Sequence, residues 1–320
     1  MRHFRFIAAV AFSLLCLAAC DKPSDDPGNG DKPSTPGELS VRISSFNVLA
    51  DAGKAPWASR KDAIRGIVTR SRHNPDIICF QECHSDPPLS DLQAMFADAY
   101  TFHKSSKSGI SPSLIAWKKD KFQYSNGGVV DMLQGNSAYV SSDYTTHRYA
   151  HWVKLQSIAD GRELFVFDIH VKTNGSSVSY QQLRYDCITA LCPKALGMAG
   201  NCPVVICGDF NNYMNTVDGV ISAPAACKAG GFTEAASVAA KTENLRYKTS
   251  GIDLEGAQAH KWSGGTDQRI DFIFASCAGG FSVPFYQTVI DFASGSDINL
   301  NTPVPSDHHP VSADFVFKYE

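Results

Sequence analysis

Asp209 and Asn211 carry the clearest chemical signature in the chain, because they directly follow the apolar run 204–206. An apolar run of this kind predicts a buried strand, and a buried strand delivers both side chains to one edge of a sheet. A carboxylate and a carboxamide at such an edge suit phosphate-ester chemistry. A single turn of this kind is weak evidence on its own.

Three more segments place acids or imidazoles at or next to an apolar run. The residues concerned are Glu82, Asp271, Asp307 and His308. Asp271 is the hardest to dismiss as a surface acid, since it lies between Ile270 and Phe272, and a carboxylate among buried apolar residues needs a partner. Four such turns in one chain therefore predict one shared site.

The residue types define what this site could bind. Hard oxygen ligands come from Glu82, Asp209, Asp271 and Asp307, neutral carbonyls from Asn47 and Asn211, and imidazoles from His170 and His308. An oxygen-rich site without thiolates favours Mg²⁺ or Mn²⁺ over zinc. A phosphate ester needs charge neutralisation, a positioned water and a stabilised leaving oxygen, and this set could provide all three.

Apolar runs and alternating patterns predict the strands that position these residues. The predicted strands are 41–47, 77–80, 113–117, 122–124, 152–155, 164–171, 204–209, 269–274 and 311–317, and the predicted helices are 59–71, 89–100 and 180–196. Strands outnumber helices, and short turns join many neighbours, so an all-parallel sheet is not expected. Mixed sheets packed face to face with outer helices fit better.

The N-terminal segment predicts export. Arg2 and Arg5 precede the apolar stretch 6–19, which is too short to cross a bilayer comfortably, and Cys20 follows it. This ending resembles a bacterial lipoprotein box, so we expect residues 1–19 to be a lipoprotein signal peptide. Cys20 would then be the lipidated residue that anchors an exported protein to the cell envelope, on an inner or outer membrane that the sequence does not distinguish.

Residues 20–38 are rich in Pro, Gly, Ser and Asp, and this stretch contains no large apolar side chain. Such a composition predicts a flexible tether. The catalytic domain is therefore expected to span 39–320.

Composition narrows the class of partner. The 320 residues are 43% hydrophobic and 19% charged, which is ordinary for a globular protein with a substantial core. Without residues 1–19, 27 basic side chains face 32 acidic ones, a formal charge of −5. This excess of acidic side chains does not indicate a polyanion-binding surface, so nucleic acid is not the favoured partner. We expect a monomer.

Ten cysteines are present, eight of them in the predicted domain. Disulfides are permitted in an exported protein, and Cys192 and Cys202, which flank a short loop, are the best candidates for a bridge. Among the cysteines, zinc-finger spacing with partnering histidines is absent, so a structural zinc site is not expected.

The order of the motifs resembles the metal-dependent endonuclease/exonuclease/phosphatase superfamily, which includes deoxyribonuclease-I-like nucleases, neutral sphingomyelinases and inositol-polyphosphate phosphatases. The segments that carry the resemblance are Ser45–Asn47, Gln81–Glu82, Asp168–His170, Gly208–Asn211, Arg269–Asp271 and Ser306–His308. They cover nearly all of the folded region in the family's order. The resemblance implies an α/β protein of the α+β type, a four-layer α/β/β/α sandwich of two mixed β-sheets flanked by helices.

The resemblance also implies roles for single residues. Glu82 and Asn47 would hold the divalent metal, Mg²⁺ or Mn²⁺, with Asp307 as a further ligand or an orienting group. The implied catalytic residues are His170, Asp209, Asn211, Asp271 and His308. Asp209 and Asn211 would position the attacking water and the phosphate. The two histidines would hydrogen-bond the phosphate oxygens, and Asp271 would fix the tautomer of His308.

Some positions depart from the family's pattern or lie at its rim. Many bacterial relatives carry Asn-Thr-His-Leu-Asp-His where this chain has Asp-Ile-His-Val-Lys-Thr at 168–173. The added carboxylate of Asp168 could orient the ring of His170. Arg148 and His260 stand where relatives have rim residues, which implies substrate contacts.

We therefore expect a metal-dependent hydrolase of phosphate esters, a phosphodiesterase or phosphatase that acts on a small or lipid-linked substrate. One alternative is a secreted non-specific nuclease of the same superfamily, which would need a basic groove. The other is a surface lipoprotein that binds phosphate or glycan without turnover, although a binder has no need of a water-activating acid. The substrate is left open, because it depends on loops at 103–112, 134–148 and 212–260.

Overall fold

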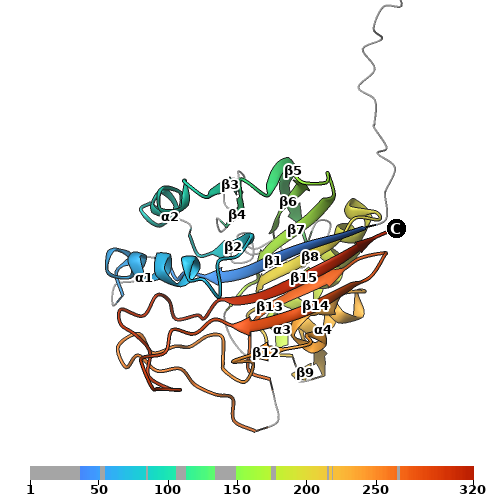
Figure 1. Cartoon of the computed structure of the whole chain (residues 1–320). Coiled ribbons are helices and arrows are strands. Elements are labelled where there is room, and N and C mark those ends of the chain that lie inside the picture. The colour runs from blue at the N-terminus through green and yellow to red at the C-terminus, as the bar shows by residue number, and fades with distance from the viewer. Residues whose placement is uncertain are drawn as a thin grey trace, which may run out of the picture. The chain divides into compact units, whose positions relative to one another are not determined.

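The computed structural model of the protein describes residues 37–50, 55–83, 86–105, 113–133, 149–173, 178–214, 216–217, 219–264 and 267–320. One mixed sheet contains the strands β1 (Gly37–Asn47), β2 (Ile77–Gln81), β3 (Tyr100–Lys104), β4 (Leu114–Lys118), β12 (Thr242–Glu243), β14 (Phe281–Thr288) and β15 (Val311–Tyr319). Its strand order is β12-β14-β15-β1-β2-β4-β3. The first and last strands of the domain, β1 and β15, run side by side in antiparallel pairing (Figure 1).

The second mixed sheet contains the strands β5 (Phe122–Asp131), β6 (Tyr149–Ser157), β7 (Glu163–His170), β8 (Val204–Asp209), β11 (Thr233–Glu234) and β13 (Asp271–Ser276). Its order is β11-β13-β8-β7-β6-β5. A short hairpin of β9 (Thr216–Val217) and β10 (Val220–Ile221) pairs separately. The helices are α1 (Trp57–Thr69), α2 (Pro88–Phe96), α3 (Val178–Ala199), α4 (Ala223–Ala229) and α5 (Ala235–Val238).

Each sheet contains a central parallel pair of strands that a helix connects. In the first sheet β1 pairs with β2 in parallel, and α1 connects them. In the second sheet β7 pairs with β8 in parallel, and α3 connects them. A parallel pair brings the carboxyl ends of its strands to the same sheet edge, where βαβ proteins place their sites.

Apolar side chains alternate across both sheets and so form three cores. In β2, for example, Ile77 and Cys79 face the second sheet, whereas Ile78 and Phe80 face α1 and α2. In β8, Val205 and Cys207 face the first sheet, whereas the neighbouring Val204 and Ile206 pack under α3 and α4. The layers are therefore helix, sheet, sheet, helix, and the predicted four-layer sandwich is confirmed.

The predicted elements are largely present, but one helix is shorter than predicted, and β3, β14 and the short elements between Asp209 and Asp271 were not predicted. The predicted helix 89–100 ends at Phe96, because Tyr100 begins β3, which pairs with β4. The strand β14 was not predicted at all. Its sequence contains Pro284, and its pairing with β15 is interrupted between Ser282 and Phe285. Proline and a register shift break the alternation by which a strand is found.

The predicted disulfide between Cys192 and Cys202 is wrong, because both are free cysteines. Cys192 lies on α3 and contacts Cys227 of α4, whereas the Cys202 thiol lies 4.0 Å from Glu163 Oε2. The two residues therefore face different neighbours. The predicted signal peptide, most of the tether and Cys20 lie outside the described residues. Within the described part, no helix combines the length and apolar character needed to cross a bilayer.

Gly208, next to Asp209, gives a test of how tightly the central strands must approach. Its φ is +143°, and a Cβ at this position would lie 2.0 Å from the backbone oxygen of Ile169. We expect Gly208→Ala to lower the free energy of unfolding by about 3 kcal/mol or more, since it combines backbone strain with overpacking. Denaturant unfolding measures the change.

A matched control is Gly197→Ala in α3, where a Cβ would meet nothing within 4 Å. Alanine is preferred to glycine inside a helix, so this variant should be as stable as the parent or gain about 0.5–1 kcal/mol. Equal stability of the two variants would contradict the close approach of β7 and β8.

Candidate active site

Three of the predicted catalytic residues form one row at the end of the second sheet. His170 ends β7 and pairs in register with Asp209, which ends β8. Asp271 begins β13 and pairs with the same Asp209 from the other side. The strand pairing alone therefore brings together an imidazole and two carboxylates that lie up to 101 positions apart, from 170 to 271.

The first sheet contributes Asn47 and Glu82. Asn47 ends β1 and pairs with Gln81, the last residue of β2, and Glu82 follows with a φ of 58°. A glutamate with a left-handed backbone conformation is uncommon and strained, and residues in such conformations concentrate at functional sites. The Asn47 Nδ2 group donates to Glu82 Oε1 at 2.9 Å and to Asp209 Oδ2 at 3.1 Å. Asn47 thus links the carboxylates of both sheets.

Asp209 Oδ2 is the atom on which the site converges. It accepts a hydrogen bond from the amide of Asn47, as described above. Two imidazole nitrogens also lie near this oxygen, His170 Nε2 at 3.6 Å and His308 Nε2 at 3.9 Å. His170 Nε2 is also 3.8 Å from Glu82 Oε1. The other oxygen, Oδ1, accepts the backbone N–H of Asn211 at 2.8 Å. One oxygen therefore holds the turn, and the other faces two imidazoles.

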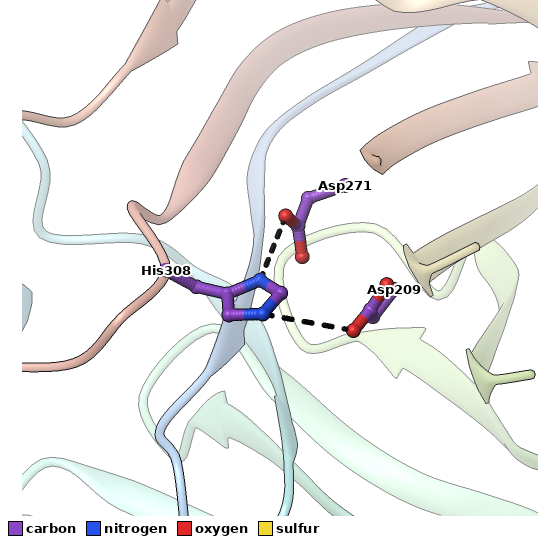
Figure 2. A group of neighbouring side chains, drawn as sticks. All are labelled: Asp209, Asp271 and His308. Carbon is purple, nitrogen blue, oxygen red and sulfur yellow. Dashed lines mark hydrogen bonds and ion pairs between the residues drawn. The ribbon is translucent and has the colours of Figure 1, made fainter. Parts of the chain in front are cut away.

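His308 lies between two buried carboxylates, as Figure 2 shows. Its Nδ1 is 3.0 Å from Asp271 Oδ2, so Nδ1–H donates to Asp271 and Nε2 is directed toward Asp209. The Thr249 hydroxyl oxygen accepts the backbone N–H of Asp271 at 3.1 Å and so fixes its strand. The predicted pairing of Asp271 with His308 is present in the structure.

The charges of this pair follow from its surroundings. Burial lowers the pKa of His308, but the charge and hydrogen bond of Asp271, together with Asp209 and Asp307, outweigh it and raise the pKa to about 10. Burial also raises the pKa of Asp271 to about 6, with Asp209 adding to the rise and His308 opposing it. Near neutral pH the pair is therefore an imidazolium and a carboxylate.

Glu82 and Asp307 are two of the residues that the sequence predicts as metal ligands, and their surroundings shift their pKa values in opposite directions. Burial and the neighbouring Glu82 raise the pKa of Asp307, although His308 opposes the rise. Burial also acts to raise the pKa of Glu82, but His170 and the amide of Asn47 lower it below its usual range. Asp307 is half-buried, and its Oδ1 lies 3.4 Å from the Ser306 hydroxyl. Hard oxygen donors of this kind suit Mg²⁺ or Mn²⁺.

The hydrogen bonds of Asn47 define which way its side-chain amide points. Its Oδ1 accepts the backbone N–H of Leu49 at 3.0 Å, while its Nδ2 faces the two acids. In this orientation it donates to Glu82 and Asp209 and does not turn its oxygen toward them. Among the described residues, the three ligating groups that lie within 4.8 Å of one another are those of Asp209, Asp271 and His308. The metal roles of Asn47, Glu82 and Asp307 stay predictions.

Two buried arginines that were not predicted position the site. Arg60 of α1 donates to the carbonyls of Val48 and Leu49 at 2.9 and 2.6 Å, and to that of Pro305 at 2.6 Å. It therefore joins the segment after Asn47 to the one before Ser306. The only sequence signal was a charged residue on the apolar side of a helix.

Arg184 of α3 acts in the same way behind His170. Its guanidinium donates to the carbonyl oxygens of Lys172 and Thr173 at 2.7 and 2.6 Å. Burial lowers the pKa of Arg184, and the negative charge of nearby Asp209 opposes that shift. Arg184 thus fixes the turn after β7.

The remaining predicted residues differ in their contacts. Asn211 has a φ of 47°, and its Nδ2 donates to the carbonyl of Val171 at 2.9 Å. His260 is exposed, and its carbonyl accepts the N–H of Lys248. Arg148 lies outside the described residues. The carboxyl group of Asp168 accepts a hydrogen bond from Gln81 at 2.6 Å, and its suggested effect on the His170 ring stays a prediction.

Comparison with known proteins decides the family. Residues 44–308 match the model of the endonuclease/exonuclease/phosphatase family. The chain belongs to this family. No curated protein sequence gives a significant match.

Solved structures share the fold at low identity. A Bacteroides thetaiotaomicron protein of the same family has 21% identity and a TM-score of 0.67, over 88% of this chain and 99% of its own. A mannosyl-6-phosphatase from the same organism has 21% identity and a TM-score of 0.65, over 87% and 100%. Truncated TDP2 from Caenorhabditis elegans has 18% identity and a TM-score of 0.56, over 87% and 98%.

The charge of His308 can be tested with Asp271→Asn. The raised pKa of His308 keeps the imidazolium up to about pH 10 in the parent, so a reaction that needs it should lose rate only as pH rises through that value. Removing the charge of Asp271 lowers this pKa, and the alkaline limb should move to lower pH. We expect turnover at pH 7 to fall by about 10²–10⁴-fold.

The pH–rate profile and a thermal melt measure these effects together. Asp297→Asn is a suitable control, because Asp297 pairs with Lys261 on the surface. An alkaline limb that stays in place in Asp271→Asn would show that His308 is not the titrating group.

Proposed function

We propose that this protein is a divalent-metal-dependent hydrolase that cleaves phosphate esters by in-line attack of water. The observation that carries the proposal is the convergence of His170, His308 and Asn47 on the single oxygen Oδ2 of Asp209. A carboxylate surrounded by hydrogen-bond donors can orient a water molecule. The same donors can hold the oxygens of a phosphoryl group.

The residues divide into those that hold charge and those that move protons. Glu82 and Asp307, with Asn47 beside them, would hold the ion, which when bound would neutralise charge on the phosphate oxygens. Asp209 would accept the proton of the attacking water or orient it. His308, kept protonated by Asp271, would stabilise charge on a phosphoryl oxygen or give a proton to the leaving oxygen.

His170 and Asn211 would bind the remaining phosphoryl oxygens. His170 Nε2 lies between Glu82 Oε1 and Asp209 Oδ2, so it is placed to reach an oxygen that approaches either acid. Asn211 is held by its own backbone hydrogen bond to Asp209 and by its amide contact to Val171. A residue fixed at two points can orient a substrate at little further entropic cost.

We propose a small or lipid-linked phosphate ester as the substrate class. The acidic balance of the sequence supports this choice over nucleic acid, which would need a basic groove. One structurally similar protein is named a mannosyl-6-phosphatase, so a phosphorylated sugar belongs in the first panel of substrates. We also propose that the protein is exported and anchored through Cys20.

A substrate panel with defined metals tests the function. We expect the parent to hydrolyse a chromogenic phosphomonoester or phosphodiester with Mg²⁺ or Mn²⁺ and to lose activity in a chelator. Glu82→Ala should lose at least about 10²-fold in the metal-dependent rate, because a ligand carboxylate is removed. Sugar 6-phosphates and plasmid DNA complete the panel, and product release is measured for each.

Glu255→Ala is the matched control, since Glu255 is an exposed glutamate. It should behave like the parent. A parent rate in Glu82→Ala would contradict the metal assignment. If the parent hydrolyses none of the substrates with either metal, the result would favour a binding protein without turnover. Preferential cleavage of DNA would favour a nuclease.

A further inference from the structure

A chain of polar side chains crosses the apolar interface between the two sheets beside the site. It contains Ser45 of β1, Gln81 of β2, Asp168 of β7, His151 of β6, Ser113 next to β4 and His103 of β3. All but His103 are buried, with at most 7% of their surface exposed. Buried polar groups in such a position are costly unless they are satisfied, so the chain calls for a physical reason.

Asp168 is the centre of this chain. It is 1% exposed and accepts a hydrogen bond at Oδ1 from Gln81 Nε2 at 2.6 Å. Its other neighbour in the chain is the uncharged hydroxyl of Ser113. Its Oδ2 makes no hydrogen bond with the described residues. A buried carboxylate without a cation is unfavourable, whereas a proton on Oδ2 would let the group donate toward Ser113.

The other side chains of this polar chain can form hydrogen bonds that are compatible with a protonated Asp168. The Ser113 hydroxyl lies 3.0 Å from His151 Nδ1, and His151 Nε2 lies 2.7 Å from His103 Nδ1. If the acid donates to Ser113, the hydroxyl can donate to His151, and His151 can donate to His103. Every member is then neutral. Burial supports this state, because it raises the pKa of Asp168 to about 8 and lowers that of His151 to about 3.

Gln81 connects Asp168 to the residues of the site through its own hydrogen bonds. Its Nε2 also contacts the Ser45 hydroxyl at 3.1 Å, and its backbone carbonyl accepts the N–H of Val48 at 3.1 Å. Gln81 pairs in register with Asn47 and directly precedes the strained Glu82. A loss of the bond to Asp168 would therefore act on the carboxylate that is expected to hold the metal.

We propose that Asp168 is a positioning residue that works as a neutral acid, orienting Gln81 and through it the metal-binding carboxylate of Glu82. This inference rests on the proposed function. It differs from a purely structural role, because it states that the hydrogen bond to Gln81, and not the negative charge of Asp168, is needed. An asparagine can make that hydrogen bond, whereas a leucine of similar size cannot.

The experiment compares Asp168→Asn and Asp168→Leu with the parent in two measurements. The first is Mn²⁺ affinity, by calorimetry or by the spin-resonance signal of the free ion, and the second is kcat and KM on the best ester. We expect Asp168→Leu to lose about 10–100-fold in Mn²⁺ affinity and in kcat, as outer partners of metal ligands do. Asp168→Asn should stay within about threefold of the parent.

Ser44→Ala is the control for lost stability. Ser44 lies on β1, is fully buried and bonds to His73 Nε2 at 2.8 Å, so its removal breaks a buried hydrogen bond without touching Gln81. It should lower the melting temperature and leave Mn²⁺ affinity and kcat unchanged. If Asp168→Leu does not fold, Gln81→Met replaces it, because it removes the other partner of the same hydrogen bond.

The outcomes separate the two proposals. Parent-like Mn²⁺ affinity and kcat in Asp168→Leu would overturn the inference, and so would an Asp168→Asn variant as impaired as Asp168→Leu. If the parent hydrolyses no ester but Asp168→Leu still weakens Mn²⁺ binding and Asp168→Asn does not, the proposed function fails and the positioning role stands.

Discussion

The site depends on a hydrogen bond that crosses from one sheet to the other, from Asn47 Nδ2 to Asp209 Oδ2. Asn47 ends β1, and Asp209 ends β8, so the bond joins the carboxyl end of the β1–β2 pair to that of the β7–β8 pair. Sheets packed face to face lie about 10 Å apart, and side chains must bridge that distance. The packing of the apolar interface therefore sets the geometry of the chemistry.

Electrostatics explains why this convergence is stable. The acids Glu82, Asp209, Asp271 and Asp307 would repel one another if they stood alone. His308 relieves part of this repulsion, since its imidazolium bonds to Asp271 and lies near Asp209. Burial is the first cause of the raised pKa of Asp307, and the excess of negative charge at neighbouring Glu82 adds to it. A bound cation would offset that excess, so the charge pattern and the expected metal dependence have one cause.

The sequence predicted the parts of the site that follow strand ends. Asp209 and Glu82 were found because a polar residue after an apolar run is a local signal, and Asp271 because it lies between two apolar residues. Arg60 and Arg184 were missed, because their partners are backbone carbonyls of distant segments, and no side-chain pattern marks a carbonyl. The strand β14 was missed because Pro284 breaks its alternation. Local signals identified the chemical groups, whereas long-range backbone contacts that hold them needed the structure.

Asp168 illustrates a contact of the same long-range kind. From the sequence it lay two residues before His170 and was expected to act on that ring, yet its hydrogen bond goes to Gln81 of the other sheet. A buried polar chain costs free energy, and an apolar interface of equal volume would be at least as stable. Its place beside Glu82 gives a reason for keeping it. Directional hydrogen bonds fix the relative register of two sheets near the site, which apolar packing alone specifies less sharply.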